Sequence, residues 1–187
     1  MKITELTLTP IKTARTTGIY SRHIILQVFT DEGITGCGEI ADVGDYRIRV
    51  PHMEVLAAAL KRALIGEDPR RIGVVHQRLR RIPGMWESAE AAVEMALYDI
   101  AGKKLGVHAS ELIGTGRMRD FVEVTYPIFP CSEPEHPQEN MAHIDRMFGQ
   151  GWRRFRYYCG RNPDMDEEFL TLFRGKYGDS VVLTSLD

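Results

Sequence analysis

The chain has 187 residues, of which 43% are hydrophobic and 27% are charged, and its formal net charge is -2. These values are typical of a globular protein with enough apolar residues for a core. Twenty-four basic residues against 26 acidic ones give no positive excess for contacts with a phosphate backbone, so nucleic-acid binding is disfavoured. No stretch reaches the roughly 18 apolar residues of a membrane span, and the N-terminus lacks the layout of a signal peptide. We therefore expect a cytoplasmic protein without membrane contact.

The first 40 residues have the pattern of antiparallel strands. Residues 4–11 alternate loosely between apolar and polar, and residues 23–29 are rich in β-branched and aromatic side chains. The turn sequence Asp31-Glu32-Gly33 then leads into a further strand over residues 34–40, which predicts a hairpin. Residues 13–22 between the first two strands are polar, and we expect a mobile loop there.

A helical period replaces the strand pattern after residue 51. Apolar residues at spacings of three and four predict helices over residues 52–64, 70–81 and 89–105. Ser88 is a typical N-cap residue for the third helix, and Gly106 is a typical residue just beyond a helix end. Strands followed by three helices indicate an α+β domain.

The rest of the chain alternates between short apolar runs and helical patterns. Strands are predicted at residues 121–128, 153–158 and 180–186, with helices at residues 138–148 and 164–176. The order β-α-β-α-β is typical of a parallel sheet with helical crossovers. Three such strands cannot cover both faces and both edges of a parallel sheet, so we expect this part to belong to a larger fold.

Three cysteines are spread along the chain: Cys37, Cys131 and Cys159. No Cys-x-x-Cys pair and no Cys/His ligand spacing occurs, which disfavours a disulfide framework and a structural zinc site. We interpret the three residues as small apolar side chains in a reducing compartment, with a single catalytic cysteine as the alternative.

Several motifs resemble the enolase superfamily, in its mandelate racemase and muconate lactonizing enzyme branch. Residues 28–39 (VFTDEGITGCGE) are similar to the hairpin of that family's capping domain, and residues 91–106 (AAVEMALYDIAGKKLG) to its long helix, which residues 111–114 (ELIG) continue. Residues 151–158 (GWRRFRYY) stand where the family has its second barrel strand. The resemblance implies an α+β capping domain followed by the first β/α units of a (β/α)8, TIM-like barrel that is incomplete in this chain. We expect the capping domain over residues 1–118 and strands 1 to 3 of the barrel over residues 119–187.

The resemblance also implies a chemistry. Three carboxylates at strand ends hold Mg²⁺ in such enzymes, and the metal stabilises the enediolate formed when the proton next to a carboxylate is removed. A sugar-acid dehydratase is the favoured activity, and a racemase or a cycloisomerase is the alternative. A non-catalytic interaction or structural module is a third interpretation. The substrate would be a small carboxylate, and homo-oligomers are common among such proteins.

In the second domain, three residues are candidates for the active site. Arg156 and Tyr158 lie two apart on one strand, so they share a face, and they stand where the resemblance places a Lys-x-Lys pair. Arginine is a poor base but binds carboxylates well, whereas tyrosine acts as a base only when a neighbouring charge lowers its pKa. This departure from paired lysines favours the dehydratase. Asp187, 29 residues after Tyr158, matches the family's first metal-binding carboxylate, and the other metal ligands would lie beyond this chain.

In the capping domain the candidates are weaker. Arg15 and Arg22 flank the loop that the resemblance places over the substrate, and His23 follows on the second strand. These three residues are interpreted as substrate-binding residues, and the alternative is an ordinary role on the protein surface or within the sheet. Asp99, inside the helix motif, is predicted to be a structural partner of residues of the capping domain or the barrel rather than a catalytic residue.

Overall fold

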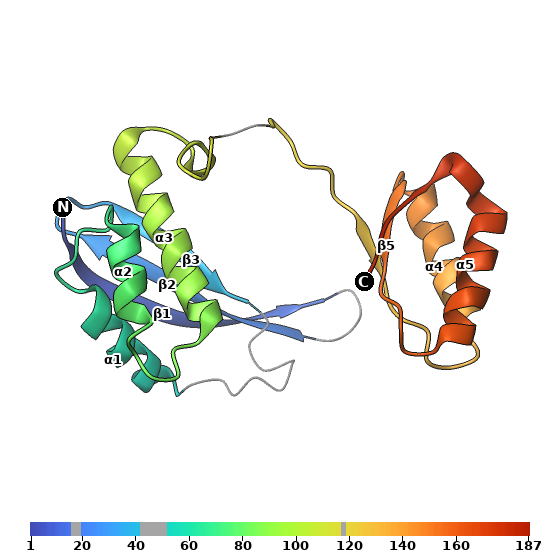
Figure 1. The fold of residues 1–187 in the computed structure, drawn as a ribbon, viewed down its shortest axis with the longest axis horizontal. Coiled ribbons are helices and arrows are strands. Elements are labelled where there is room, and N and C mark those ends of the chain that lie inside the picture. The colour runs from blue at the N-terminus through green and yellow to red at the C-terminus, as the bar shows by residue number, and fades with distance from the viewer. Residues whose placement is uncertain (16–19, 42–51, 117–118) are drawn as a thin grey trace. The chain divides into compact units, whose positions relative to one another are not determined.

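The computed structural model describes residues 1–15, 20–41, 52–116 and 119–187. The chain forms two compact units, Met1–Met118 and Arg119–Asp187 (Figure 1). Each unit has a hydrophobic core of its own. Within the described ranges, no helix combines the length and the apolar character that crossing a membrane requires.

An antiparallel sheet forms one layer of the first unit. Strands β1 (Ile3–Ala14), β2 (Tyr20–Thr30) and β3 (Thr35–Ile40) pair in the order β1-β2-β3. From Ile24 to Thr30 every second residue of β2 is buried, and Leu26 and Val28 are fully buried, as the alternation of side chains along a strand requires. The predicted β2-β3 hairpin is confirmed.

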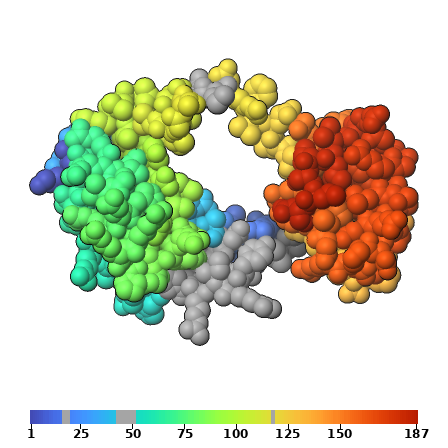
Figure 2. Space-filling view, viewed as in Figure 1, coloured from blue at the N-terminus to red at the C-terminus, as the bar shows by residue number. Residues whose placement is uncertain are grey.

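Three helices cover one face of this sheet: α1 (Met53–Leu64), α2 (Ile72–Leu79) and α3 (Glu87–Leu105). They conceal most of the strands in the view of Figure 2. The three predicted helices are confirmed, and Gly106 follows α3 in the left-handed conformation with φ 71°. A left-handed residue at this position is the usual way to end a helix, and glycine adopts it without steric penalty.

Glycines allow α3 to lie directly on β3. A Cβ atom added to Gly36 would lie 2.1 Å from the carbonyl oxygen of Ala96, and one added to Gly38 would lie 1.8 Å from that of Ala92. Both separations are far below any real contact distance. Small residues on both sides therefore bring the helix backbone against the strand.

The second unit is a parallel sheet with two crossover helices. Its elements in chain order are β4 (Tyr126–Ile128), α4 (His136–Gly149), β5 (Arg154–Tyr157), α5 (Pro163–Tyr177) and β6 (Val182–Leu186), with the strands in the order β4-β5-β6. The predicted β-α-β-α-β order and the parallel pairing are both confirmed. A short 3₁₀ turn, Gly178–Ser180, connects α5 to β6, and another, Ala109–Glu111, follows α3 in the first unit.

Aromatic side chains build the core of this second unit. Phe155 and Tyr157 on β5 are fully buried, and they pack against Phe169 and Phe173 of α5. Because successive side chains of a strand point to opposite faces, Arg156 lies on the other face of the sheet from this core.

Three expectations about local structure are wrong in detail. Residues 13–14 and 20–22 of the predicted loop are strand, because the β1-β2 ladder continues to the pair Ala14 and Tyr20, and polar composition at this end of the hairpin hides the pairing. Residues 16–19 of that loop lie outside the described residues. Ser88 is not the N-cap of α3: the helix begins at Glu87, after an extended Trp86 whose side chain makes no capping hydrogen bond.

The apolar run at residues 121–128 is also shorter as a strand than predicted. Only Tyr126–Ile128 pairs with β5, while Phe121 and Val122 are 76% and 80% exposed. A strand requires a neighbour for its backbone groups, and β5 offers one to these three residues alone.

Candidate active site

The ends of β5 and β6 bring together the three candidates of the second unit. Arg156 donates a hydrogen bond from Nη2 to the Tyr158 hydroxyl, and its guanidinium carbon lies 4.6 Å from the centre of the Tyr158 ring. Arg156 Nη1 lies 3.8 Å from Asp187 Oδ2. A cation, a phenol and a carboxylate are therefore adjacent at the carboxyl ends of two neighbouring parallel strands, where β/α proteins place their ligands.

Backbone hydrogen bonds fix this arrangement. The Asp187 N–H donates to the carbonyl oxygen of Tyr157 at 2.9 Å, and the Cys159 N–H donates to that of Asp187 at 2.8 Å. The parallel ladder thus continues past the last strand residues and holds Asp187 level with Tyr158. The Tyr158 N–H in turn donates to the Ile128 carbonyl at 3.0 Å, which ties the site to the end of β4.

An aromatic residue that sequence reasoning missed completes the group. Phe129 directly follows β4, and its ring stacks on that of Tyr158, with centroids 6.2 Å apart and planes 14° from parallel. Its position one residue beyond a parallel strand is the signal that could have identified it, because the carboxyl ends of such strands gather at one edge. Phe129 is 56% exposed, so one face of the stacked pair is accessible.

The charges of the site are accessible to solvent. The side chains of Arg156 and Asp187 are 39% and 54% exposed, and a solvent-exposed ion pair contributes about 1 kcal/mol or less to stability. This pair is therefore not needed to hold the fold together, and both groups are free to bind a charged ligand.

The predicted metal is tested by the donors present. Asp187 offers hard carboxylate oxygens of the type that Mg²⁺ prefers. Among the residues that the structure describes, no group of three His, Cys, Asp or Glu side chains is placed to hold a metal ion. The described residues thus supply one of the three predicted metal ligands, and no reaction step through a metal follows from them.

The candidates of the capping domain lie in the first unit. Arg15 donates a hydrogen bond from Nε to the Ser21 hydroxyl. His23 Nδ1 lies 2.6 Å from Glu39 Oε1, without the alignment of a hydrogen bond. Arg22 and His23 share a mainly apolar pocket of about 410 Å³, lined by Pro10, Ile11, Lys12, Arg22, His23, Ile24 and Met53. The structure therefore brings Arg22 and His23 together in one pocket and gives Arg15 a separate partner.

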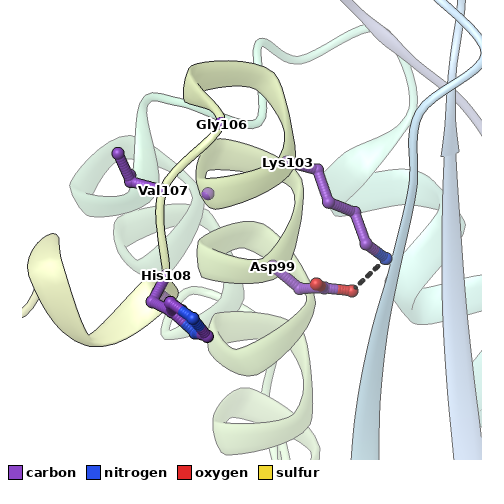
Figure 3. A pocket seen from close by; sticks show the side chains of 7 residues that line it. Asp99, Lys103, Gly106, Val107 and His108 are labelled. Atoms are coloured by element: carbon purple, nitrogen blue, oxygen red, sulfur yellow. Dashed lines mark hydrogen bonds and ion pairs between the residues drawn. The ribbon is translucent and has the colours of Figure 1, made fainter.

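Asp99 has the structural role that the sequence predicts. Its Oδ2 accepts a hydrogen bond from Lys103 Nζ at 2.7 Å (Figure 3). The same oxygen accepts the Cys37 N–H at 2.9 Å, and Lys103 also donates to the Thr35 carbonyl at 2.7 Å. These bonds fasten α3 to the end of β3. Asp99 and Lys103 also line a pocket of about 360 Å³, together with Gly102, Gly106, Val107, His108 and Ala109.

Similar proteins of known activity cover most of this chain. It is 31% identical over 164 residues to the N-succinyl-L-Arg/Lys racemase of Bacillus cereus, a match that covers 86% of this chain and 42% of the racemase. It is 33% identical over 162 residues to the D-galactonate dehydratase of Pectobacterium atrosepticum, covering 83% of this chain and 38% of the dehydratase. The chain thus spans less than half the length of these two relatives.

Solved structures share the fold of both units. The muconate lactonizing enzyme of Pseudomonas putida superimposes with a TM-score of 0.81 at 25% identity, over 99% of this chain and 52% of that one. A mandelate racemase/muconate lactonizing enzyme-type protein of Roseovarius nubinhibens, solved in complex with magnesium, gives a TM-score of 0.83 at 23% identity, over 99% of this chain and 51% of that one.

The predicted fold, an α+β capping domain followed by β/α units of a TIM-like barrel, is therefore confirmed. Residues 2–114 match the N-terminal domain of the mandelate racemase / muconate lactonizing enzymes. With that match over more than half of its length, the chain belongs to the mandelate racemase / muconate lactonizing enzyme family of the enolase superfamily.

Proposed function

We propose that the protein carrying this chain removes the proton next to the carboxylate of a small organic acid, a sugar acid that it then dehydrates. The observation that carries this proposal is the grouping of Arg156, Tyr158 and Asp187 at the ends of β5 and β6. The D-galactonate dehydratase of Pectobacterium atrosepticum, similar over 83% of this chain, supports the substrate class.

Each residue of the group has a role that suits its chemistry. Arg156 offers a planar, permanently charged fork that binds the substrate carboxylate. Tyr158 exchanges the proton, and the N–H that Arg156 donates to its oxygen stabilises that oxygen whenever it carries negative charge. Asp187 would be one ligand of Mg²⁺, and the bound metal would supply positive charge for an oxyanion on the substrate.

The second candidate function is racemisation, and a specific observation favours it. The racemase of Bacillus cereus is similar over 86% of this chain, slightly more than the dehydratase. Racemisation needs proton-transfer groups on both faces of the planar intermediate. Arg156 is a poor proton-transfer group, so of Arg156 and Tyr158 only Tyr158 serves in this way. Dehydration is therefore the first candidate function.

The test is turnover by the full-length protein, with and without Mg²⁺, on a panel of sugar acids and N-acyl amino acids. Tyr158→Phe removes only the hydroxyl, and we expect turnover to fall by about 100-fold or more. Tyr177→Phe is the matched control, because its hydroxyl binds Asp145 on the helical side of the same unit. Absence of both turnover and Mg²⁺ binding would contradict the proposal and favour a non-catalytic module.

A further inference from the structure

A buried carboxylate lies directly behind the candidate active site. Asp166, in the first turn of α5, is 7% exposed. It accepts the hydroxyl of Tyr157 on Oδ1 and the N–H of Gly160 on Oδ2, the latter at 2.7 Å. Gly160 belongs to the segment between β5 and α5, so this one carboxylate joins the strand, the segment after it and the next helix.

Burial shows that the Tyr157 hydroxyl keeps its proton and donates it as a hydrogen bond. Desolvation, followed by the Asp166 carboxylate and the Cys131 thiol, raises the pKa of Tyr157 above its ordinary value. Asp166 therefore receives two donors and is the acceptor at the centre of the cluster. A buried carboxylate is tolerated only with such partners, because unpaired burial of a charge is strongly unfavourable.

A second polar side chain holds the segment after β4. Asn140 of α4 donates from Nδ2 to the Phe129 carbonyl at 2.9 Å and to Cys131 Sγ at 3.4 Å. Cys131 is fully buried and lies beside the Tyr157 hydroxyl. The polar contacts thus run continuously from α4 through the segment after β4 to Tyr157, and from there to Asp166 on α5.

These two segments carry the aromatic pair of the site. Phe129 is held by Asn140 through its own carbonyl, and Tyr158 lies between Tyr157 and Gly160, which both bind Asp166. The two rings stack across the gap between the segments. The network therefore fixes, from the helical side of the sheet, the orientation of groups on the opposite side.

We infer that Asp166 and Asn140 are positioning residues: they hold the segments after β5 and β4 so that Tyr158 and Phe129 stack beside Arg156. As far as turnover is concerned, this inference rests on the proposed function. The geometric part stands on its own, because the stacking and the protection of the Gly160 amide are measurable in the absence of substrate.

The test compares Asp166→Asn with Asp145→Asn in the full-length protein. Asp145 is a suitable control because it also accepts a tyrosine hydroxyl, that of Tyr177 at 2.5 Å, but on the surface between α4 and α5. We expect Asp166→Asn to speed amide exchange at Tyr158 and Gly160 by about tenfold or more, since the amide side chain cannot accept both donors equally well. The ring-current shift of Tyr158 against Phe129 should decrease in its NMR spectrum.

Turnover then separates positioning from simple stability. Asp166→Asn should lower kcat by about tenfold with a smaller change in KM, because a misplaced group weakens the chemical step more than binding. Asp145→Asn should leave kcat unchanged even if it lowers the thermal midpoint equally. Unchanged exchange and an unchanged ring-current shift in Asp166→Asn, or equal kcat losses in the two variants, would overturn the inference.

A milder variant covers the case in which Asp166→Asn does not fold. Asn140→Ala removes the bonds to Phe129 and Cys131, and Glu139→Ala, an exposed neighbour on α4, is its control. Loss of the Tyr158 ring-current shift in Asn140→Ala alone supports the inference, and an unchanged shift overturns it. If the unmodified protein turns over no substrate, the proposed function fails, while exchange and ring-current shifts still decide the positioning role.

Discussion

The contact between α3 and β3 gives a sharp prediction for the stability of the first unit. In Gly38→Ala the new Cβ would lie 1.8 Å from the Ala92 carbonyl oxygen and 2.7 Å from its carbonyl carbon, and both are backbone atoms that no rotamer change can move. Helix and strand must separate by more than 1 Å, which breaks the packing of the buried face. Overpacking of this kind costs about 3 kcal/mol of unfolding free energy.

Gly73→Ala is the matched control. Gly73 lies within α2, and a Cβ there would meet no atom within 4 Å. Because alanine loses less conformational freedom than glycine in a helix, this variant should gain about 0.5–1 kcal/mol. The two Gly→Ala substitutions are thus predicted to have opposite signs.

The assay is denaturant unfolding followed by tryptophan fluorescence. The chain has two tryptophans, and Trp86 packs against the first core while Trp152 packs against the second. In a Trp152→Phe background, Trp86 alone reports the first unit. Unfolding free energies of the two glycine variants that agree within about 0.5 kcal/mol, the usual scatter of surface substitutions, would refute the close-packing argument.

Two further predictions concern the pH dependence of the second unit. Lys176 and then Tyr177 hold the pKa of Asp145 below its usual value, so its stabilisation is present above the unfolded pKa near 4 and is lost as pH falls through the folded pKa. Asp145→Asn should therefore lower the thermal midpoint at pH 7, and the difference should disappear in acid; a constant difference would contradict the ion pair. Burial and then Arg146 lower the pKa of His143, so the stability it provides when neutral falls as pH drops below about 6.5. His143→Gln should reduce the loss of thermal midpoint as the pH falls below about 6.5, and an unchanged slope would show that another group titrates there.

The elements that the sequence predicts well are those with a strong apolar period. The helix α1 and strand β2, the latter from Ile24 on, have their buried residues at the spacing of their own geometry. The side to which Arg156 points follows in the same way, because the buried Phe155 and Tyr157 flank it on β5. Alternation along a single strand is local information, so one sequence suffices to read it.

Other features depend on contacts between distant parts of the chain. Phe121 belongs to an apolar run that is typical of a strand, but a strand forms only beside a neighbouring strand, and the local sequence does not specify that neighbour. The stacking of Phe129 on Tyr158 and the binding of Gly160 by Asp166 join residues of different elements. For these features the decisive fact is a spatial juxtaposition, which no local pattern encodes.

The most direct test of the proposed chemistry follows the proton next to the substrate carboxylate. The full-length protein is incubated in D₂O with Mg²⁺ and the best acid of the panel, and loss of the α-proton signal is followed by NMR for the unmodified protein and for Asp187→Asn. We predict Mg²⁺-dependent loss of this signal in the unmodified protein and a decrease of about 100-fold or more in Asp187→Asn, as for removal of a group that stabilises the transition state. An α-proton that is lost no faster than without protein, or equally fast with Asp187→Asn, would contradict the proposal.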